Sequence, residues 1–365
     1  MKIHKVHFPN LNGIRCIAAF MVLFPHIEQI KKGLGLSRTV NFYPWAFGTL
    51  GVVLFFVLSG FLITYLLLCE QEEQGYISII KFYTRRILRI WPLYYLIVLL
   101  ALFILPHVSF LNDKTLPTQS LLLDNVILYL CFLPKLSQDI PFISHTWSIR
   151  IELLFYLSSP IFINYLLVKK KALITIGIFT SITLIFLTQP STLSVLYSFI
   201  QLYKIDCIFI GALFGFLLFK KNDLLVILYS KKIQIITYTT ILVILTSNIK
   251  IPLLHFEVFA ILFGIVILNL ASNNNSILKL DNSIINHIGK ISYGIYMFHP
   301  FIIYITIKIL IALNWTSPIF HYVIPTLFTV LASHLSYTFY ESFFIKKKKS
   351  FSVILSGENV STKQL

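Results

Sequence analysis

Arg15 and His26 lie eleven residues apart within the first long apolar run of the chain. A charge near the centre of a bilayer costs several kcal/mol, so each such residue is a functional hypothesis. Eleven residues of α-helix return to nearly the same face, about 16 Å further along the axis. This face suits a long ligand whose phosphates are held by Arg15 and whose reactive end lies near His26. The plainer interpretation is an arginine that reaches the membrane interface and a histidine hydrogen-bonded near a helix end.

Pro25 stands directly before His26. Proline removes one backbone hydrogen bond, so it can open the helix beside the imidazole. The imidazole itself has an ordinary pKa near 6.5 and can accept a proton at physiological pH. These residue types therefore predict proton transfer combined with the binding of an anionic ligand.

A second group, Arg86 and Arg89, lies in the segment 82–92, where the third apolar run begins. Residues three apart share one face of a helix, and two guanidinium groups on one face could clamp a phosphate. Arg85 is expected to point elsewhere. The alternative is ordinary anchoring by basic residues on the cytoplasmic side, next to a belt of aromatic residues.

Further ionisable residues fall within the predicted membrane helices, and these are Glu152, Asp206, His299 and Glu341. Glu152 could orient an imidazole, act as a base or pair with Arg150. Asp206 lies near Lys204, which is consistent with a structural ion pair. His299 lies about 12 Å into its span, at 1.5 Å per residue. Glu341 could pair with one of the arginines.

The composition defines the class of protein. Apolar residues make up 57% of the 365 positions and charged residues 12%, and the mean hydropathy is +0.83. A soluble domain needs more polar surface, so lipid must surround most of this chain. The net charge of +16 is concentrated in clusters between apolar runs, which is typical of cytoplasmic loops and excludes a nucleic-acid partner. The four cysteines have no metal-ligand spacing, so we predict no metal site.

The hydropathy predicts an all-α membrane bundle of about ten spanning helices with both termini in the cytoplasm. The first helix is expected to be uncleaved. We divide the chain into a membrane domain, 1–345, and a basic and polar cytoplasmic tail, 346–365. Three basic residues, Lys31, Lys32 and Arg38, fall on the outer side and do not fit the charge rule. The predicted spans are 11–30, 47–68, 90–106, 147–168, 172–188, 193–219, 233–248, 254–271, 291–313 and 319–343.

Taken in order, these motifs resemble the acyltransferase-3 family of bacterial integral membrane O-acyltransferases. The resemblance runs from about residue 11 to 343 and depends on six matches, each weak alone. Differences from the family pattern include Asn12 in place of the usual Asp, Val53 in place of a polar residue and Pro25 before the histidine. The matching segments are 11–26, with its Arg and His; 51–64; Arg86 with Arg89; 147–152; 291–300; and Ser336, Tyr337 and Glu341.

The resemblance implies transfer of an acyl group, usually acetyl, from cytoplasmic acyl-CoA to a sugar hydroxyl on the outer side of the bacterial inner membrane. His26 would be catalytic, as a general base or a transient acyl carrier. Glu152 would be the second catalytic residue. Arg15, Arg86 and Arg89 would bind acyl-CoA. The residues expected to support the site are Trp147, Asp206, His299, Tyr337 and Glu341.

Acyl-CoA would be the donor substrate, and no bound cofactor is expected. The acceptor would be a surface polysaccharide or its lipid-linked precursor. Because the sequence contains no fused periplasmic domain, the chain would act on the acceptor itself or with a separate periplasmic partner. The alternative is a transporter or flippase of polysaccharide precursors, which usually shows a repeated architecture that this sequence lacks.

Overall fold

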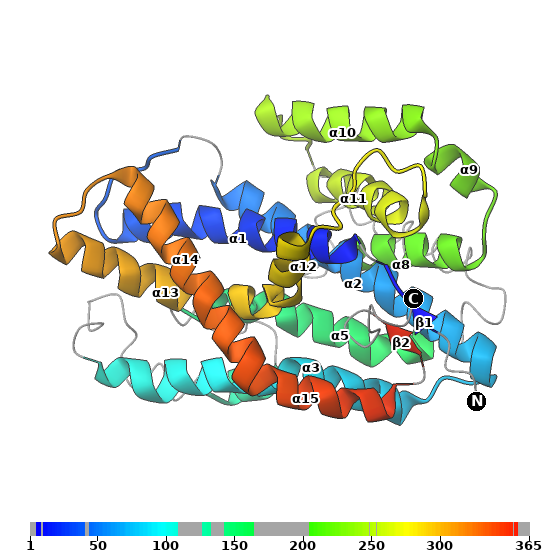
Figure 1. Cartoon of the computed structure of the whole chain (residues 1–365), viewed down its shortest axis with the longest axis horizontal. Helices are drawn as coiled ribbons and strands as arrows, with labels where there is room; N and C mark the ends of the chain where they lie inside the picture. The colour runs from blue at the N-terminus through cyan, green and yellow to red at the C-terminus, as the bar shows by residue number, and fades with distance from the viewer. Residues whose placement is uncertain are drawn as a thin grey trace, which may run out of the picture.

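The computed structural model describes residues 5–8, 10–40, 44–108, 126–132, 142–163, 204–247, 249–252, 254–352 and 354–356. Helices make up most of this part of the chain (Figure 1). Two predicted spans, 172–188 and the first part of 193–219, lie outside the described residues.

The longer helices follow the chain order shown in Figure 1. They are α1 (Leu11–Gly33), α2 (Pro44–Gln74), α3 (Ile79–Leu99), α5 (Trp147–Phe162), α8 (Ile205–Phe219), α10 (Lys231–Thr246), α11 (His255–Ser272), α13 (Ser292–Ala312) and α14 (Pro318–Ser336). The shorter elements are β1 (Lys5–Val6), η1 (Leu100–Ile104), η2 (Leu105–His107), η4 (Ser144–Thr146), α9 (Leu224–Leu228), α12 (Ser283–Lys290), η6 (Tyr337–Glu341), α15 (Ser342–Lys348), η7 (Lys349–Phe351) and β2 (Leu355–Ser356).

Six helices in the described ranges are long and apolar enough to cross a membrane, and α8 is a shorter apolar helix. The chain is therefore a multi-pass helical membrane protein. The α10 helix, which corresponds to the predicted span 233–248, is not among these six. The last span is longer than predicted, because α14, η6, α15 and η7 continue as one helical segment over Pro318–Phe351.

The third helix begins eleven residues before the predicted span 90–106. Its first turn follows Ser78, whose backbone N–H donates to Glu70 at 3.0 Å. Hydropathy missed this start because the charged residues there lower the average, although they lie on the helix. Arg86 and Arg89 are thus held by α3 and not by a loop.

Helix α1 contains the proline that could open the helix beside His26. Pro25 lies inside α1, which continues without interruption through His26 to Gly33. Proline near the middle of this helix therefore removes one hydrogen bond without ending the helix. Arg15 and His26 remain on one rigid element.

The centre of the bundle is the close packing of α2 against α8. A side-chain carbon on Gly60 would overlap the carbonyl oxygen of Ile208, and one on Gly211 would overlap that of Val57. Gly215 approaches the backbone of Phe61 in the same way. Small residues at four-residue spacing allow two membrane helices to bring their backbones together. This close contact explains why position 60, within the segment 51–64, is a glycine.

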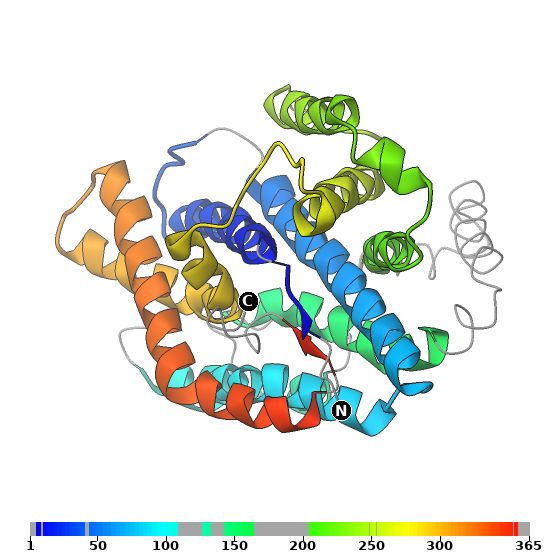
Figure 2. The same cartoon turned by 45° about the vertical axis from the view of Figure 1, so that its right-hand side comes forward.

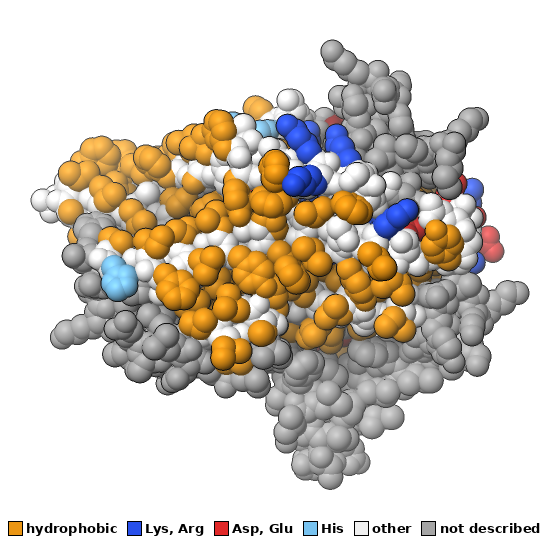
Figure 3. Space-filling model, turned by 90° about the horizontal axis from the view of Figure 1, so that it is seen from below, with side chains coloured by type: hydrophobic (Ala, Val, Ile, Leu, Met, Phe, Trp, Pro, Cys, Tyr) orange, Lys and Arg blue, Asp and Glu red, His pale blue; other side chains and the backbone are white. Residues whose placement is uncertain are grey.

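Other surfaces of the bundle are apolar and exposed. Along α14, the side chains of Val323, Leu327 and Leu331 are 45%, 61% and 51% exposed. Their spacing places them on one helical face, which suits contact with lipid. Hydrophobic side chains also cover much of the molecular face in Figure 3, and Lys and Arg gather on one side of it.

Lys31, which did not fit the charge rule, is buried in an ion pair. Its ammonium lies 2.7 Å from the Glu28 carboxylate, and the two side chains are 2% and 3% exposed. Tyr322 of α14 donates to Glu28 at 2.6 Å, and the backbone N–H of Thr39 donates to the same carboxylate at 3.0 Å. Lys31 therefore joins α1, the following loop and α14, and its charge does not indicate a cytoplasmic loop.

The two described ends of the chain meet. Strands β1 and β2 pair in parallel, with Lys5 opposite Leu355 and Val6 opposite Ser356. Figures 1 and 2 show both strands near the end of the bundle where α2 passes to α3. Val6 and Ile354 pack in one apolar cluster with Cys69.

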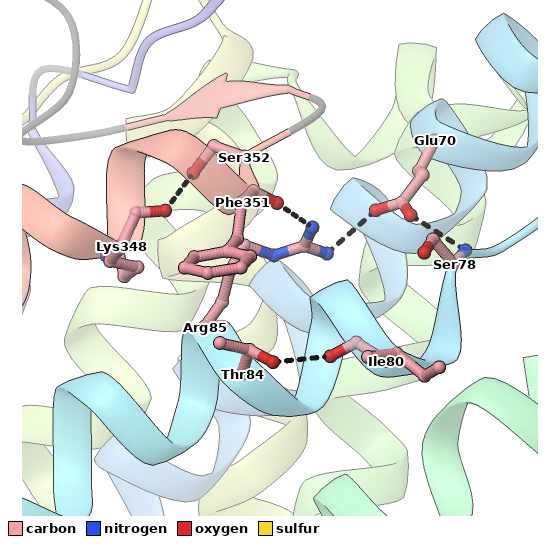
Figure 4. Close-up of polar contacts among 8 residues, drawn as sticks. All are labelled: Glu70, Ser78, Ile80, Thr84, Arg85, Lys348, Phe351 and Ser352. Carbon is pink, nitrogen blue, oxygen red and sulfur yellow. Dashed lines mark hydrogen bonds and ion pairs between the residues drawn. The ribbon is translucent and has the colours of Figure 1, made fainter.

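Arg85 connects this C-terminal segment to the bundle (Figure 4). Its guanidinium donates to the Glu70 carboxylate at 2.7 Å and to the carbonyl oxygen of Phe351 at 2.9 Å. Arg85 is thus bound to Glu70 and to the C-terminal segment, and its guanidinium carbon lies 5.9 Å from the ring centre of Phe82, a ring that Arg86 also contacts.

Candidate active site

A cavity of about 120 Å³ opens among α1, α2, α3, α5 and α13. Arg15, Arg86 and Arg89 all line it, so helices distant in sequence bring the three predicted donor-binding residues to one space. Glu152 of α5 lines the same cavity. The polar residues that complete it are Ser59, Ser148, Tyr156, Ser292, Tyr293 and Tyr296.

Arg86 is held between two aromatic rings. The carbon of its guanidinium lies 5.5 Å from the ring centre of Phe82 and 5.4 Å from that of Tyr156. Stacking of this kind orients a guanidinium without using its N–H groups. The Nε atom of Arg86 is buried and has no hydrogen-bond partner among the described residues. The residue is therefore positioned to bind an anion.

Glu152 is anchored across the cavity wall. Its carboxylate accepts hydrogen bonds from the hydroxyls of Ser59 on α2 and Tyr156 on α5. Arg150, its sequence neighbour, has its guanidinium 4.8 Å from the ring centre of Tyr129. The carboxylate of Glu152 thus faces the arginine-lined cavity, where it lies within electrostatic reach of Arg86.

His26 lies beyond this cavity, in a cluster of three imidazoles. Its ring centre is 4.7 Å from that of His299 on α13, which is 5.0 Å from that of His145 in η4. The Nδ1 atom of His26 is 2.8 Å from the carbonyl oxygen of Val22. A carbonyl can only accept, so neutral His26 carries its proton on Nδ1 and leaves Nε2 as the basic nitrogen.

Tyr296 stands between the cavity and the imidazoles. It lines the cavity, and its ring centre is 5.2 Å from that of His145 and 5.8 Å from that of His299. Its hydroxyl lies 2.6 Å from both the Ser148 hydroxyl and the carbonyl oxygen of His145. The arrangement thus places an arginine-lined cavity next to three imidazoles, with Tyr296 in contact with both.

The remaining predicted residues are distributed around this site. Trp147 begins α5 and packs its ring edge-on against Phe56. Glu341 is buried in η6 and accepts from Ser336 at 3.0 Å, next to Tyr337 in the same turn.

Asp206 is buried in the first turn of α8, near Glu257 and Lys204, and does not line the cavity. The ammonium of Lys204 lies 4.3 Å from the ring centre of Phe256. The burial of Asp206 and the contact of Lys204 with Phe256 therefore belong to the packing of α8 against α11, and neither residue lines the cavity.

Sequence reasoning missed His145 and Tyr296 as members of the site. His145 stands just before the predicted span 147–168, so hydropathy alone places it outside the membrane helices, yet it is 5% exposed. Tyr296 is three residues before His299, so it shares a helical face with that histidine. In the described ranges, no group of three or more His, Cys, Asp and Glu side chains is arranged to hold a metal ion.

The fold is that of a multi-pass helical membrane protein, and its site combines three arginines in one cavity with a histidine cluster beside it. Comparison with known proteins gives the family. The acyltransferase domain model of the acyltransferase-3 family matches residues 8–338. This match covers most of the chain, which therefore belongs to that family.

Curated relatives are more distant. O-acetyltransferase OatA of Staphylococcus aureus (strain NCTC 8325 / PS 47) is 26% identical over 388 aligned positions, which cover 93% of this chain. "Putative O-acetyltransferase SACOL0978" of S. aureus (strain COL) is 26% identical over 378 positions. The chain spans 58% of the length of each of these relatives. No solved structure shows significant similarity to it.

Proposed function

We propose that this protein is a membrane-embedded O-acyltransferase of the bacterial inner membrane. It transfers an acyl group, acetyl in the simplest case, from cytoplasmic acyl-CoA to a sugar hydroxyl of a cell-surface polysaccharide or its lipid-linked precursor. The observation that carries the proposal is the meeting of Arg15, Arg86 and Arg89 in one cavity beside a histidine cluster that contains His26. The names of the relatives support acetyl as the group transferred.

The donor side follows from charge. Acyl-CoA carries several phosphate groups, and arginine binds phosphate oxygens bidentately and with charge assistance. Stacking between Phe82 and Tyr156 holds Arg86 in place before the donor arrives, so less side-chain entropy is lost on binding. Glu152 balances part of the positive charge while the cavity is empty.

The chemical step follows from the tautomer of His26. Its free Nε2 either removes the proton of the acceptor hydroxyl or attacks the thioester carbon and carries the acyl group. Each route breaks the carbon–sulfur bond of the donor and forms a carbon–oxygen bond to the acceptor. A site walled by apolar helices also keeps water away from the thioester.

The decisive experiment measures O-acetyl esters on envelope glycans by mass spectrometry, in cells with the gene, without it and with His26→Ala. We expect esters with the wild-type gene and their loss, by about a hundredfold or more, in the other two strains. Immunoblotting of membranes controls for expression. Wild-type ester content in cells that make only His26→Ala would contradict the proposed mechanism, and acyl-CoA-independent glycan transport would favour a transporter.

A further inference from the structure

A second, smaller cavity of about 30 Å³ adjoins the arginine-lined cavity. Ile63 and Arg86 line both spaces, so the two cavities share a wall. The C-terminal segment contributes Lys348, Ser352 and Ile354 to the lining of the smaller cavity. The arginine-lined cavity is thus continued, beyond Arg86, by a space that the end of the described chain covers.

Cationic side chains dominate the wall of the smaller cavity. Arg85, Arg86 and Lys348 line it, and Glu70 is the one carboxylate among its described lining residues. Glu70 accepts from Arg85 at 2.7 Å and from the backbone N–H of Ser78 at 3.0 Å (Figure 4). One carboxylate balances one of the three positive charges, so the cavity favours an anion with about two negative charges.

The volume of the smaller cavity limits which group can enter it. One buried water needs about 10–15 Å³ by this measure, so the space holds about two waters. A single phosphate group is of this size, whereas a nucleotide base is too large. A phosphate monoester carries about −1.5 to −2 charges at pH 7 and has three acceptor oxygens. Arg86 Nε, which is buried and has no hydrogen-bond partner among the described residues, could donate to one of these oxygens.

Lys348 is the cation that the C-terminal segment adds to this wall. It is one of four consecutive lysines, 346–349, and it is half-buried, whereas the other three are exposed. Anchoring at the cytoplasmic side accounts for exposed lysines, but it does not require one of them to line a cavity beside two arginines. The position of Lys348 therefore points to a bound anion.

We propose that the smaller cavity binds the phosphate monoester on the ribose of acyl-CoA and that Lys348 recognises this group. The inference rests on the proposed function, because it takes acyl-CoA as the donor. Acyl-CoA carries its phosphates in two places, the pyrophosphate along the chain and the monoester on the ribose. The pyrophosphate lies in the larger cavity with Arg15 and Arg89, and Arg86 stands where the two cavities meet. Lys348 thus makes the site selective for CoA over thioester carriers that lack the monoester.

The test compares two donors that differ only in this phosphate, acetyl-CoA and acetyl-dephospho-CoA. Full-length protein in detergent-permeabilised membranes receives each donor with a radiolabelled acetyl group, and ester-linked label in the glycan fraction is the readout. Lys348→Ala removes the cation, and Lys348→Arg keeps it. Lys346→Ala is the matched control, because it removes the same charge from an exposed position of the same helix.

We expect the wild type to have a kcat/KM about tenfold or more higher for acetyl-CoA than for acetyl-dephospho-CoA. Lys348→Ala should reduce this preference about threefold or more, by raising the KM for acetyl-CoA alone. Lys348→Arg and Lys346→Ala should keep the preference within about twofold of the wild type.

Three kinetic results would overturn the inference. The first is a wild type that uses both donors equally well, and the second is an unchanged preference in Lys348→Ala. The third is an equal rise of both KM values in Lys348→Ala, since a general attraction of anions would have this effect.

Equilibrium binding to purified protein in detergent separates this inference from the proposed function. Adenosine 3′,5′-bisphosphate should bind more tightly than AMP, and Lys348→Ala should remove most of the difference. If this holds but no membrane incorporates label, the preference for the monoester stands and the proposed function fails. Label incorporated equally from both donors would leave the function intact and refute the phosphate site. Displacement of the bisphosphate by phosphatidic acid as readily as by unlabelled bisphosphate would assign the cavity to a lipid headgroup instead.

Discussion

At the scale of single residues, the structure divides the predicted site into two parts. Arg15, Arg86 and Arg89 line the cavity, whereas His26 lies beyond Tyr296. A shared helical face for Arg15 and His26 does not by itself give a shared cavity, because Tyr296 of α13 lines the cavity where it adjoins the histidine cluster. The division matches the two tasks that we propose for the site, binding a charged donor and moving a proton.

Arg86 provides a test of the donor site. We expect Arg86→Ala to raise the KM for acetyl-CoA about tenfold or more, because a charge-assisted contact to phosphate is lost. Arg86→Lys should have a KM for acetyl-CoA between those of the wild type and Arg86→Ala, since lysine keeps the charge and loses the planar stacking on Phe82 and Tyr156. Steady-state kinetics in membranes measures both, with Lys81→Ala, an exposed cation of the same helix, as control. An unchanged KM in Arg86→Ala would exclude the residue from donor binding.

Tyr296 provides a test of the separation between cavity and imidazoles. Tyr296→Phe loses the hydroxyl that contacts Ser148 and the His145 carbonyl, so the ring is less firmly held. We expect acetyl-CoA hydrolysis to rise several-fold relative to transfer, because water reaches the thioester more easily.

Thiol release measured with and without glycan acceptor separates these two reactions. Tyr322→Phe, which loses a bond of the same 2.6 Å length to Glu28, is the control. Equal ratios of hydrolysis to transfer in Tyr296→Phe and the wild type would show that Tyr296 does not exclude water.

At the scale of helices, glycines determine how closely the elements approach. Where α2 meets α8, backbone atoms of one helix occupy the space that a side chain on a glycine of the other helix would need. Since α2 also contributes Ser59 to the cavity, the spacing of these two helices affects the position of Glu152. Packing and site geometry are therefore linked through one pair of helices.

Gly211→Ala tests this contact. Its added methyl group would overlap the carbonyl oxygen of Val57, and overpacking of this kind costs about 1–3 kcal/mol or more. We expect a lower melting temperature in detergent, measured by scanning fluorimetry, together with reduced activity. Gly33→Ala is the control, because no atom lies within 4 Å of the added carbon there. Equal melting temperatures for the two variants would argue against tight α2–α8 packing.

At the scale of the whole molecule, the parallel pairing of β1 with β2 brings the described ends of the chain to one end of the bundle. Arg85, Glu70 and the Phe351 carbonyl hold the C-terminal segment there. The pairing keeps the described ends together, which is compatible with the prediction from the positive-inside rule that both termini lie in the cytoplasm.

A disulfide between the ends tests the arrangement. We expect Val6→Cys with Ser356→Cys, in a Cys69→Ser background, to cross-link under mild oxidation, because these positions are opposed in the strand pair. Mass spectrometry of the linked peptides is the measurement. Val6→Cys with Ser317→Cys, at the start of α14, is the negative control. Cross-linking only in the control pair would refute the strand pairing.

The sequence alone determined the class of protein and most of its helices. Apolar runs have to be helical in lipid, where every backbone group needs an internal partner, so α1, α2, α11 and α13 begin or end within a few residues of their predicted bounds. The prediction of about ten spans is not confirmed by the six candidates in the described residues. The start of α3 was missed because its charged first turns lower the average hydropathy.

Only the tertiary structure determined which ionisable residues meet. Arg15, Arg86 and Glu152 share a cavity through contacts between helices far apart in sequence, which helical periodicity does not predict. The same holds for His145 and His299 beside His26, and for Lys31, whose burial against Glu28 depends on α14. Periodicity specifies the face of a helix on which a residue lies, and only the packing of that face against its neighbours specifies the residue's partner.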